Sequence, residues 1–204
     1  MARAMLCVGP MRRRGFTLVE LMIVVSIVGI LAALAIYGFR RYQQSAGTGE
    51  ATALLQTFKG AEEAYRAEFL TYGGCTDGTG AAPFSANGVG LSATDLYPRE
   101  LGNIKETKIQ WGDVGTNMGQ CFRAMGFRTS GAVRFSYGAV AGPPDASGQT
   151  PSVPGSWTRS PAVGPPSEPW YILVAYGDRD ADSTYARLST TSQTSEVQME
   201  DETE

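Results

Sequence analysis

An uninterrupted apolar segment near the N-terminus constrains this chain more than any other feature. No charged residue occurs from residue 21 to residue 39, and three consecutive arginines, residues 12–14, precede this run. An apolar stretch of about 18 residues or more is long enough to cross a bilayer as a helix. The basic cluster in front of it predicts that the N-terminal flank stays on the cytoplasmic side. The sequence therefore predicts a membrane-spanning helix.

Two residues next to this segment distinguish it from an ordinary secretory signal. Such a signal has a short apolar region followed by a small-residue cleavage site. Here the small residue, Gly15, lies before the apolar run, so cleavage after it would leave the hydrophobic helix on the mature chain. One acid, Glu20, lies at the edge of the run. Because a carboxylate in a lipid-facing segment is energetically costly, Glu20 is a candidate functional residue.

This arrangement resembles the N-terminus of the type IV pilin family and of its secretion-pseudopilin relatives. The matching segments are GFTLVELMIVV, residues 15–25, and GILAA, residues 29–33. The resemblance implies that residues 1–15 are a leader, which a membrane-bound prepilin peptidase removes between Gly15 and Phe16, and that the new amine of Phe16 is methylated. It also implies an α+β fold, the pilin α/β roll, in which a long N-terminal helix packs on a small antiparallel β-sheet.

The same resemblance implies assembly through this helix. After cleavage Phe16 carries a free amine, and Glu20 of one subunit can neutralise that amine on a neighbouring subunit. Two charges that are costly to bury alone become tolerable as a well-bonded pair. The leading hypothesis is a pilus subunit held in the inner membrane, with a periplasmic head, before an assembly platform adds it to a surface filament of pilins for motility or adhesion. The alternatives are a pseudopilin of a type II secretion system and a minor pilin for DNA uptake.

Composition argues against several other classes of function. The leader holds four arginines and no acid, so 17 − 4 = 13 basic and 20 acidic residues remain, a formal charge of −7. Such a chain lacks the basic footprint of a nucleic-acid-binding protein, and we expect no nucleic-acid partner. The absence of histidine excludes imidazole catalysis and histidine-ligated metals. Since no nucleophile elbow, metal triad or phosphate loop occurs either, we expect no enzymatic activity.

The predicted organisation has a helical N-terminal part and a mixed head. A membrane-spanning or fibre-core helix is expected over 16–40, and an amphipathic helix over 41–72 continues it. Residues 73–204 form the head. The amphipathic helix has an apolar face because apolar residues recur at spacings of three and four, while the charged residues, Glu62 among them, are expected to fall largely elsewhere. The apolar positions are Ala51, Leu54, Leu55, Phe58, Ala61, Tyr65 and Phe69.

Within the head, the sequence predicts a short helix and three strands. The helix is expected over 117–125. The first strand is expected over 133–140, where apolar and polar residues alternate. The apolar segment 170–176 is expected to be a central strand, and 185–190 a third strand.

Two further segments of the head have unusual composition. Residues 142–169 hold eight of the eleven prolines and are expected to be an exposed connection, with a contact surface between subunits as the alternative. Five acids fall in the last nine residues and predict a solvated C-terminal tail.

The cysteines and one acidic segment supply the remaining candidate sites. Cys75 and Cys121 lie beyond the leader, in a region that should face an oxidising compartment, so a disulfide between them is expected, with two free thiols as the alternative. Asp178, Asp180 and Asp182 alternate after a predicted buried strand, and carboxylate oxygens suit calcium. This segment resembles an acidic turn of several pilins and pseudopilins, some of which bind calcium. Because an arginine between the carboxylates supplies a counter-charge, a plain acidic turn without any cofactor is favoured.

Overall fold

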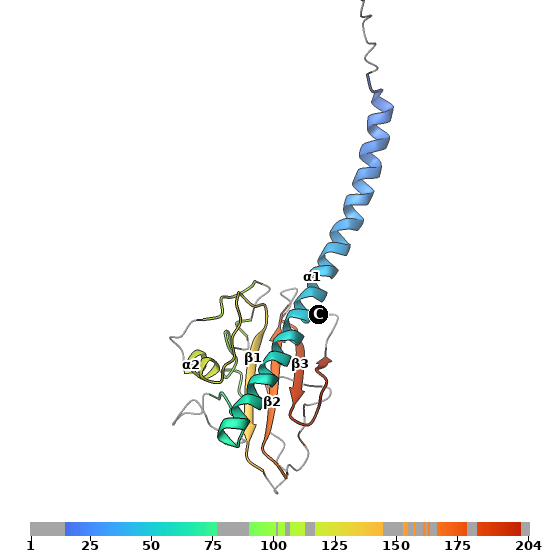
Figure 1. Cartoon of the computed structure of the whole chain (residues 1–204). Helices are drawn as coiled ribbons and strands as arrows, with labels where there is room; N and C mark the ends of the chain where they lie inside the picture. The colour runs from blue at the N-terminus through green and yellow to red at the C-terminus, as the bar shows by residue number, and fades with distance from the viewer. Residues whose placement is uncertain are drawn as a thin grey trace, which may run out of the picture. The chain divides into compact units, whose positions relative to one another are not determined.

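The computed structural model describes residues 15–76, 90–100, 102–104, 107–112, 117–144, 153–154, 157, 161, 163, 167–178 and 183–200. Its elements, in chain order, are α1 (Leu18–Phe69), α2 (Asn117–Ala124), β1 (Ser136–Gly142), β2 (Trp170–Gly177), β3 (Ala186–Thr191) and β4 (Gln198–Glu200), as Figure 1 shows. A long helix followed by a small antiparallel sheet confirms the predicted α+β class. The chain forms two compact units, Met1–Gln43 and Gln44–Glu204, and the boundary falls within α1.

The described part of the first unit is dominated by the N-terminal half of α1, which is apolar all round. Every large apolar side chain from Phe16 to Tyr42 is at least 51% exposed. An 18-residue window of the helix has a mean hydropathy of 2.7, so its length and composition suit a membrane span. A helix that is hydrophobic on all sides requires an apolar environment. No described part of the chain supplies that environment to these side chains.

In the second unit, the C-terminal half of α1 packs on the sheet through the predicted apolar face (Figure 1). Ala51, Leu55 and Phe58 are at most 1% exposed and belong to the main core. The face ends sooner than predicted, because Phe69 is 53% exposed and is the last helical residue. Leu70 then takes a left-handed conformation, with φ of 60°, so the helix ends three residues before the predicted limit at residue 72.

The four strands form one antiparallel sheet in the order β1-β2-β3-β4. The apolar β2 lies between β1 and β3, as its composition predicts, with Gly138 opposite Val174 and Ala175 opposite Leu188. The predicted first strand begins three residues later than expected, at Ser136. The short helix α2 and the third strand β3 lie within one residue of their predicted limits.

Both faces of the sheet are buried, although apolar and polar residues alternate at 133–140. All seven residues of β1 are buried, including the polar Ser136. Side chains alternate between the faces of a strand, so the two hydrophobic clusters lie on opposite sides of the sheet. Tyr137 and Leu173 face the α1 side, whereas Val140 and Val174 belong to the second cluster.

Described residues of the proline-rich segment pack on this second face, and the expectation that 142–169 is an exposed connection is wrong for several of them. Val163 is 4% exposed, and Val153 and Trp157 pack against the second cluster. The indole N–H of Trp157 donates to the hydroxyl of Tyr176 on β2, at 3.1 Å. Proline limits strand pairing in this segment, but the segment's apolar side chains can still pack on a hydrophobic surface.

The C-terminal segment is also more ordered than a solvated tail. Residues 198–200 form β4, in which Met199 pairs with Leu188 of β3 and packs against the main core. Glu200 is therefore part of the sheet, while Glu196 is exposed as expected. Val197 and Met199 explain the difference, because their apolar side chains offer burial that a count of acids ignores. Residues 201–204 lie outside the described part of the chain.

Candidate functional site

Thr17 and Glu20 form a reciprocal cap at the start of α1. The N–H and the hydroxyl of Thr17 both donate to Oε2 of Glu20, at 3.0 and 2.9 Å, and the N–H of Glu20 donates to the Thr17 hydroxyl at 3.2 Å. A threonine followed three residues later by glutamate forms a capping box, which satisfies backbone donors that the first helical turn leaves unpaired. Residues 17–20, TLVE, carry this signature, but the sequence-based hypothesis for Glu20 did not include a local role.

Both residues of the predicted cleavage site, Gly15 and Phe16, are solvent-exposed. The side chain of Phe16 is 84% exposed, and a Cβ added at Gly15 would meet no atom within 4 Å. Pairing of Glu20 with the amine of Phe16 involves two copies of the chain and stays a prediction.

The structure brings Cys75 and Cys121 together and confirms the expected disulfide. Their Cα atoms are 5.8 Å apart, and 46 residues separate them in sequence. The bond links the segment after α1 to α2, and both residues are at most 1% exposed. Cys75 is also tied to the sheet, because its N–H donates to the carbonyl of Ala139 at 2.8 Å. The disulfide thus links α2, through Cys75, to β1.

A buried acid, Glu62, was not predicted by sequence reasoning. It is 0% exposed, although the sequence analysis placed it among the charges outside the apolar face. The N–H of Gly73 donates to its Oε2 at 3.1 Å, and Oε1 has no hydrogen-bond partner among the described residues. Burial raises its pKa to about 8. The available signal was spacing: Glu62 follows Phe58 by four residues, which places both side chains on one helix face.

We expect Glu62 to make the stability of the head depend on pH. The folded state holds its proton up to about pH 8, whereas the ordinary pKa is 4.5. The free energy of unfolding should therefore fall between these values as the pH rises, by up to about 1.4 kcal/mol per pH unit, and become constant above them. Urea unfolding across this range measures the slope. Glu62→Gln should remove this contribution to the slope and stabilise the protein above pH 8, because a neutral amide still accepts from Gly73.

The matched control for this experiment is Glu68→Gln. Glu68 is an exposed acid on the same helix, so its replacement makes the same substitution without changing a buried group. It should leave the pH dependence as it is in the original protein. Equal slopes for the original protein and Glu62→Gln would contradict the role assigned to Glu62.

Next to Glu62, a network of polar side chains bonds the end of α1 to the segments that follow it and that precede β2. The guanidinium of Arg66 donates to the hydroxyl of Tyr72 at 2.9 Å, and this hydroxyl donates to Glu63 at 2.9 Å. Arg66 also forms an ion pair with Glu168, at 3.0 Å. Since Glu168 lies shortly before β2, the network links the end of the helix to the last described turn before the central strand.

The candidate calcium site is only partly described. Asp178 directly follows β2, is 7% exposed and already interacts with another group of the protein. Asp180 and Asp182 lie outside the described residues. No three metal-ligating side chains come together within the described part of the chain. Calcium binding therefore stays a prediction.

The N-terminal segment matches a known family model. Residues 10–36 match the prokaryotic N-terminal methylation motif. This range contains Gly15, Phe16 and Glu20, the three residues singled out for processing and assembly.

Several curated proteins are similar to parts of the chain. It is 42% identical over 79 residues to the type IV major pilin protein PilA of Myxococcus xanthus, covering 39% of this chain and 36% of that protein. It is 35% identical over 106 residues to the type IV major pilin protein PilE1 of Neisseria gonorrhoeae, covering 52% of this chain and 53% of the relative. A third relative, prepilin peptidase-dependent protein D of Escherichia coli, is 37% identical over 75 residues, covering 35% of this chain and 49% of that protein. The chain thus spans about a third to a half of the length of these relatives, and no solved structure matches it significantly.

Proposed function

We propose that this chain is a member of the type IV pilin family and a structural subunit of a type IV pilus; its similarity to the methylation motif and to two major pilins supports this. In this proposal, a prepilin peptidase cleaves between Gly15 and Phe16 and the new N-terminus is methylated. An assembly platform then moves the subunit from the inner membrane into an extracellular filament, where it serves motility or adhesion. The similarity to a protein named for its dependence on prepilin peptidase supports the processing step.

The observation that carries the proposal is the exposed apolar half of α1, most of which lies within the methylation motif. Its large side chains are at least 51% exposed. A helix of this composition is stabilised in a membrane, and also when packed against copies of itself, because both environments remove apolar surface from water. Gly29, Ala32 and Ala33 lie in this half, and small residues allow neighbouring helices to approach closely. The same segment can therefore serve as a membrane anchor first and as a filament core later.

The experiment that tests the proposal is quantitative intact-mass spectrometry of sheared surface filaments. We expect a species that starts at N-methyl-Phe16 and lacks the two hydrogen atoms lost on forming the Cys75–Cys121 bond. An abundant species identifies a major pilin, and a trace species a minor pilin. Processed protein that stays in the cell envelope and is absent from filaments would instead favour a pseudopilin. An unprocessed chain would overturn the proposal.

A further inference from the structure

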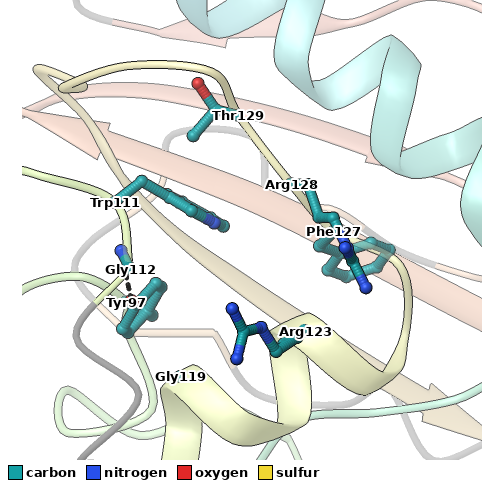
Figure 2. Close-up of a pocket in the computed structure, with 8 residues that line it drawn as sticks. All are labelled: Tyr97, Trp111, Gly112, Gly119, Arg123, Phe127, Arg128 and Thr129. Carbon is teal, nitrogen blue, oxygen red and sulfur yellow. Dashed lines mark hydrogen bonds between the residues drawn. The ribbon is translucent and has the colours of Figure 1, made fainter.

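A cavity on the head brings aromatic and cationic side chains together. It has a volume of about 140 Å³ and lies between α2, the segment before α2 and the loop after it. Figure 2 shows Trp111 projecting over the cavity and the guanidinium of Arg123 pointing into it from α2. Arg128, on the loop after α2, lies at a further side of the same space. The three side chains come from the segment before α2, from α2 itself and from the loop after it.

The indole of Trp111 forms a rigid wall of this cavity. Its ring centroid lies 4.8 Å from that of Tyr97 and 5.6 Å from that of Phe58, both of which are buried. Trp111 itself is only half-buried. These contacts hold one side of the indole in the core, while the remaining surface lines the cavity. Such a fixed aromatic surface binds a ring at little cost in side-chain entropy.

The two arginines give the cavity a positive charge. Arg123 and Arg128 are both exposed, and neither forms an ion pair with any carboxylate that the structure describes. Without residues 1–15 the chain has a formal charge of −7, so two neighbouring cations beside one cavity are a local excess of positive charge on an acidic protein. Planar guanidinium groups bind carboxylates through paired hydrogen bonds. The cavity therefore favours a ligand with an anionic group.

We propose that this cavity binds an acidic saccharide, such as a hexuronate unit of a polysaccharide, and this inference goes beyond the proposed function. The apolar C–H face of the sugar ring packs on Trp111, and its carboxylate accepts hydrogen bonds from Arg123 and Arg128. Binding sites for small ligands commonly combine an apolar wall with a few placed polar groups. The proposal gives the head a ligand-binding role that filament assembly does not require.

The geometry favours a saccharide over a nucleic acid. A protein that binds single strands tracks the backbone with a positive groove and stacks several bases on aromatic side chains. This cavity offers one half-exposed indole and two cations. The third arginine of this region, Arg134, does not line it, and its backbone N–H donates to Glu50 at 3.4 Å. One ring and one anionic group match the cavity better than a chain of phosphates.

Isothermal titration of the full-length processed protein in detergent tests the proposal. The probes are trigalacturonate, its methyl ester, inorganic phosphate and an oligo-dT of matched length. We expect saturable binding of trigalacturonate and none of the ester, which keeps the rings but loses the charges. Arg123→Gln and Arg128→Gln should each weaken binding about tenfold or more, because each removes a charge-assisted hydrogen bond. Arg134→Gln makes the same change of charge outside the cavity and should have little effect.

The remaining outcomes overturn the proposal. Absence of trigalacturonate binding would show that the cavity does not bind an acidic saccharide. Equal binding of the ester would show that the arginines do not bind the carboxylate. Equal or tighter binding of phosphate or oligo-dT identifies another anion as the ligand. An equal loss in Arg134→Gln means that binding depends on diffuse charge and not on the cavity. Circular dichroism of each variant confirms that it is folded, which is expected because both cavity arginines are exposed.

Discussion

Replacing Glu20 with alanine is expected to abolish incorporation into filaments while the protein still inserts into the membrane. In the proposed filament, this carboxylate neutralises the amine of Phe16 on a neighbouring subunit. Removing one partner of a buried ion pair costs about 3–5 kcal/mol, because the other charge stays buried and unpaired. This corresponds to a loss of more than about a hundredfold in affinity between subunits. Immunoblots of sheared filaments and of membrane fractions measure the two quantities separately.

The capping box at the start of α1 calls for two further variants. Glutamine can replace glutamate in a capping box, so Glu20→Gln keeps the local cap and removes only the charge. Thr17→Ala keeps the charge and removes the hydroxyl that bonds to Glu20. If pairing with the amine is decisive, Glu20→Gln fails as Glu20→Ala does, and Thr17→Ala assembles. The reverse pattern would assign Glu20 to the helix cap, and normal assembly of Glu20→Ala would contradict both roles.

Loss of the Cys75–Cys121 bond is expected to lower the free energy of unfolding of the head by about 4 kcal/mol, since the bond closes a loop of about 46 residues in the unfolded chain. The variant to use is the double alanine replacement. Both cysteines are buried, and serine would add unpaired hydroxyl groups to the core. Urea unfolding of the purified protein, with and without a reducing agent, measures the difference.

The reducing agent supplies the internal control for this experiment. Reduction should destabilise the original protein and leave the double alanine variant unchanged. A double variant as stable as the oxidised original would contradict the stabilising role of the bond. A variant that is already unfolded without urea would agree with it, because the bond anchors α2 to the segment after α1.

Local patterns predicted the elements whose stability depends on their own residues. The apolar run before residue 40, the face that includes Ala51, Leu55 and Phe58, and the apolar β2 all occur where the sequence placed them. The disulfide followed from a count, since only two cysteines lie beyond the predicted leader. The N-terminal motif indicated the resemblance to type IV pilins, because GFTLVE combines a predicted cleavage site with an acid that few other contexts tolerate.

The parts that were missed depend on what a segment meets after the chain has folded. Glu62 has the helical spacing of a core residue, but its charge indicated a solvent-exposed position; in the structure it is buried and accepts a hydrogen bond from Gly73. Trp157 and Val163 lie in a proline-rich segment, yet they find the second face of the sheet. Composition describes a residue's own preference and carries no information about which surface lies opposite.

The sequence by itself determined the membrane-length helix, the motif at its start and the class of the head, because these depend on short-range spacing and on hydrophobicity. Only the tertiary structure decided that both faces of the sheet are buried, that β4 continues the sheet at the C-terminal end, and that Trp111, Arg123 and Arg128 share one cavity. These features arise from contacts between separate segments of the chain. Their free energy comes from surfaces that exist only once the helix, the sheet and the covering loops have packed together.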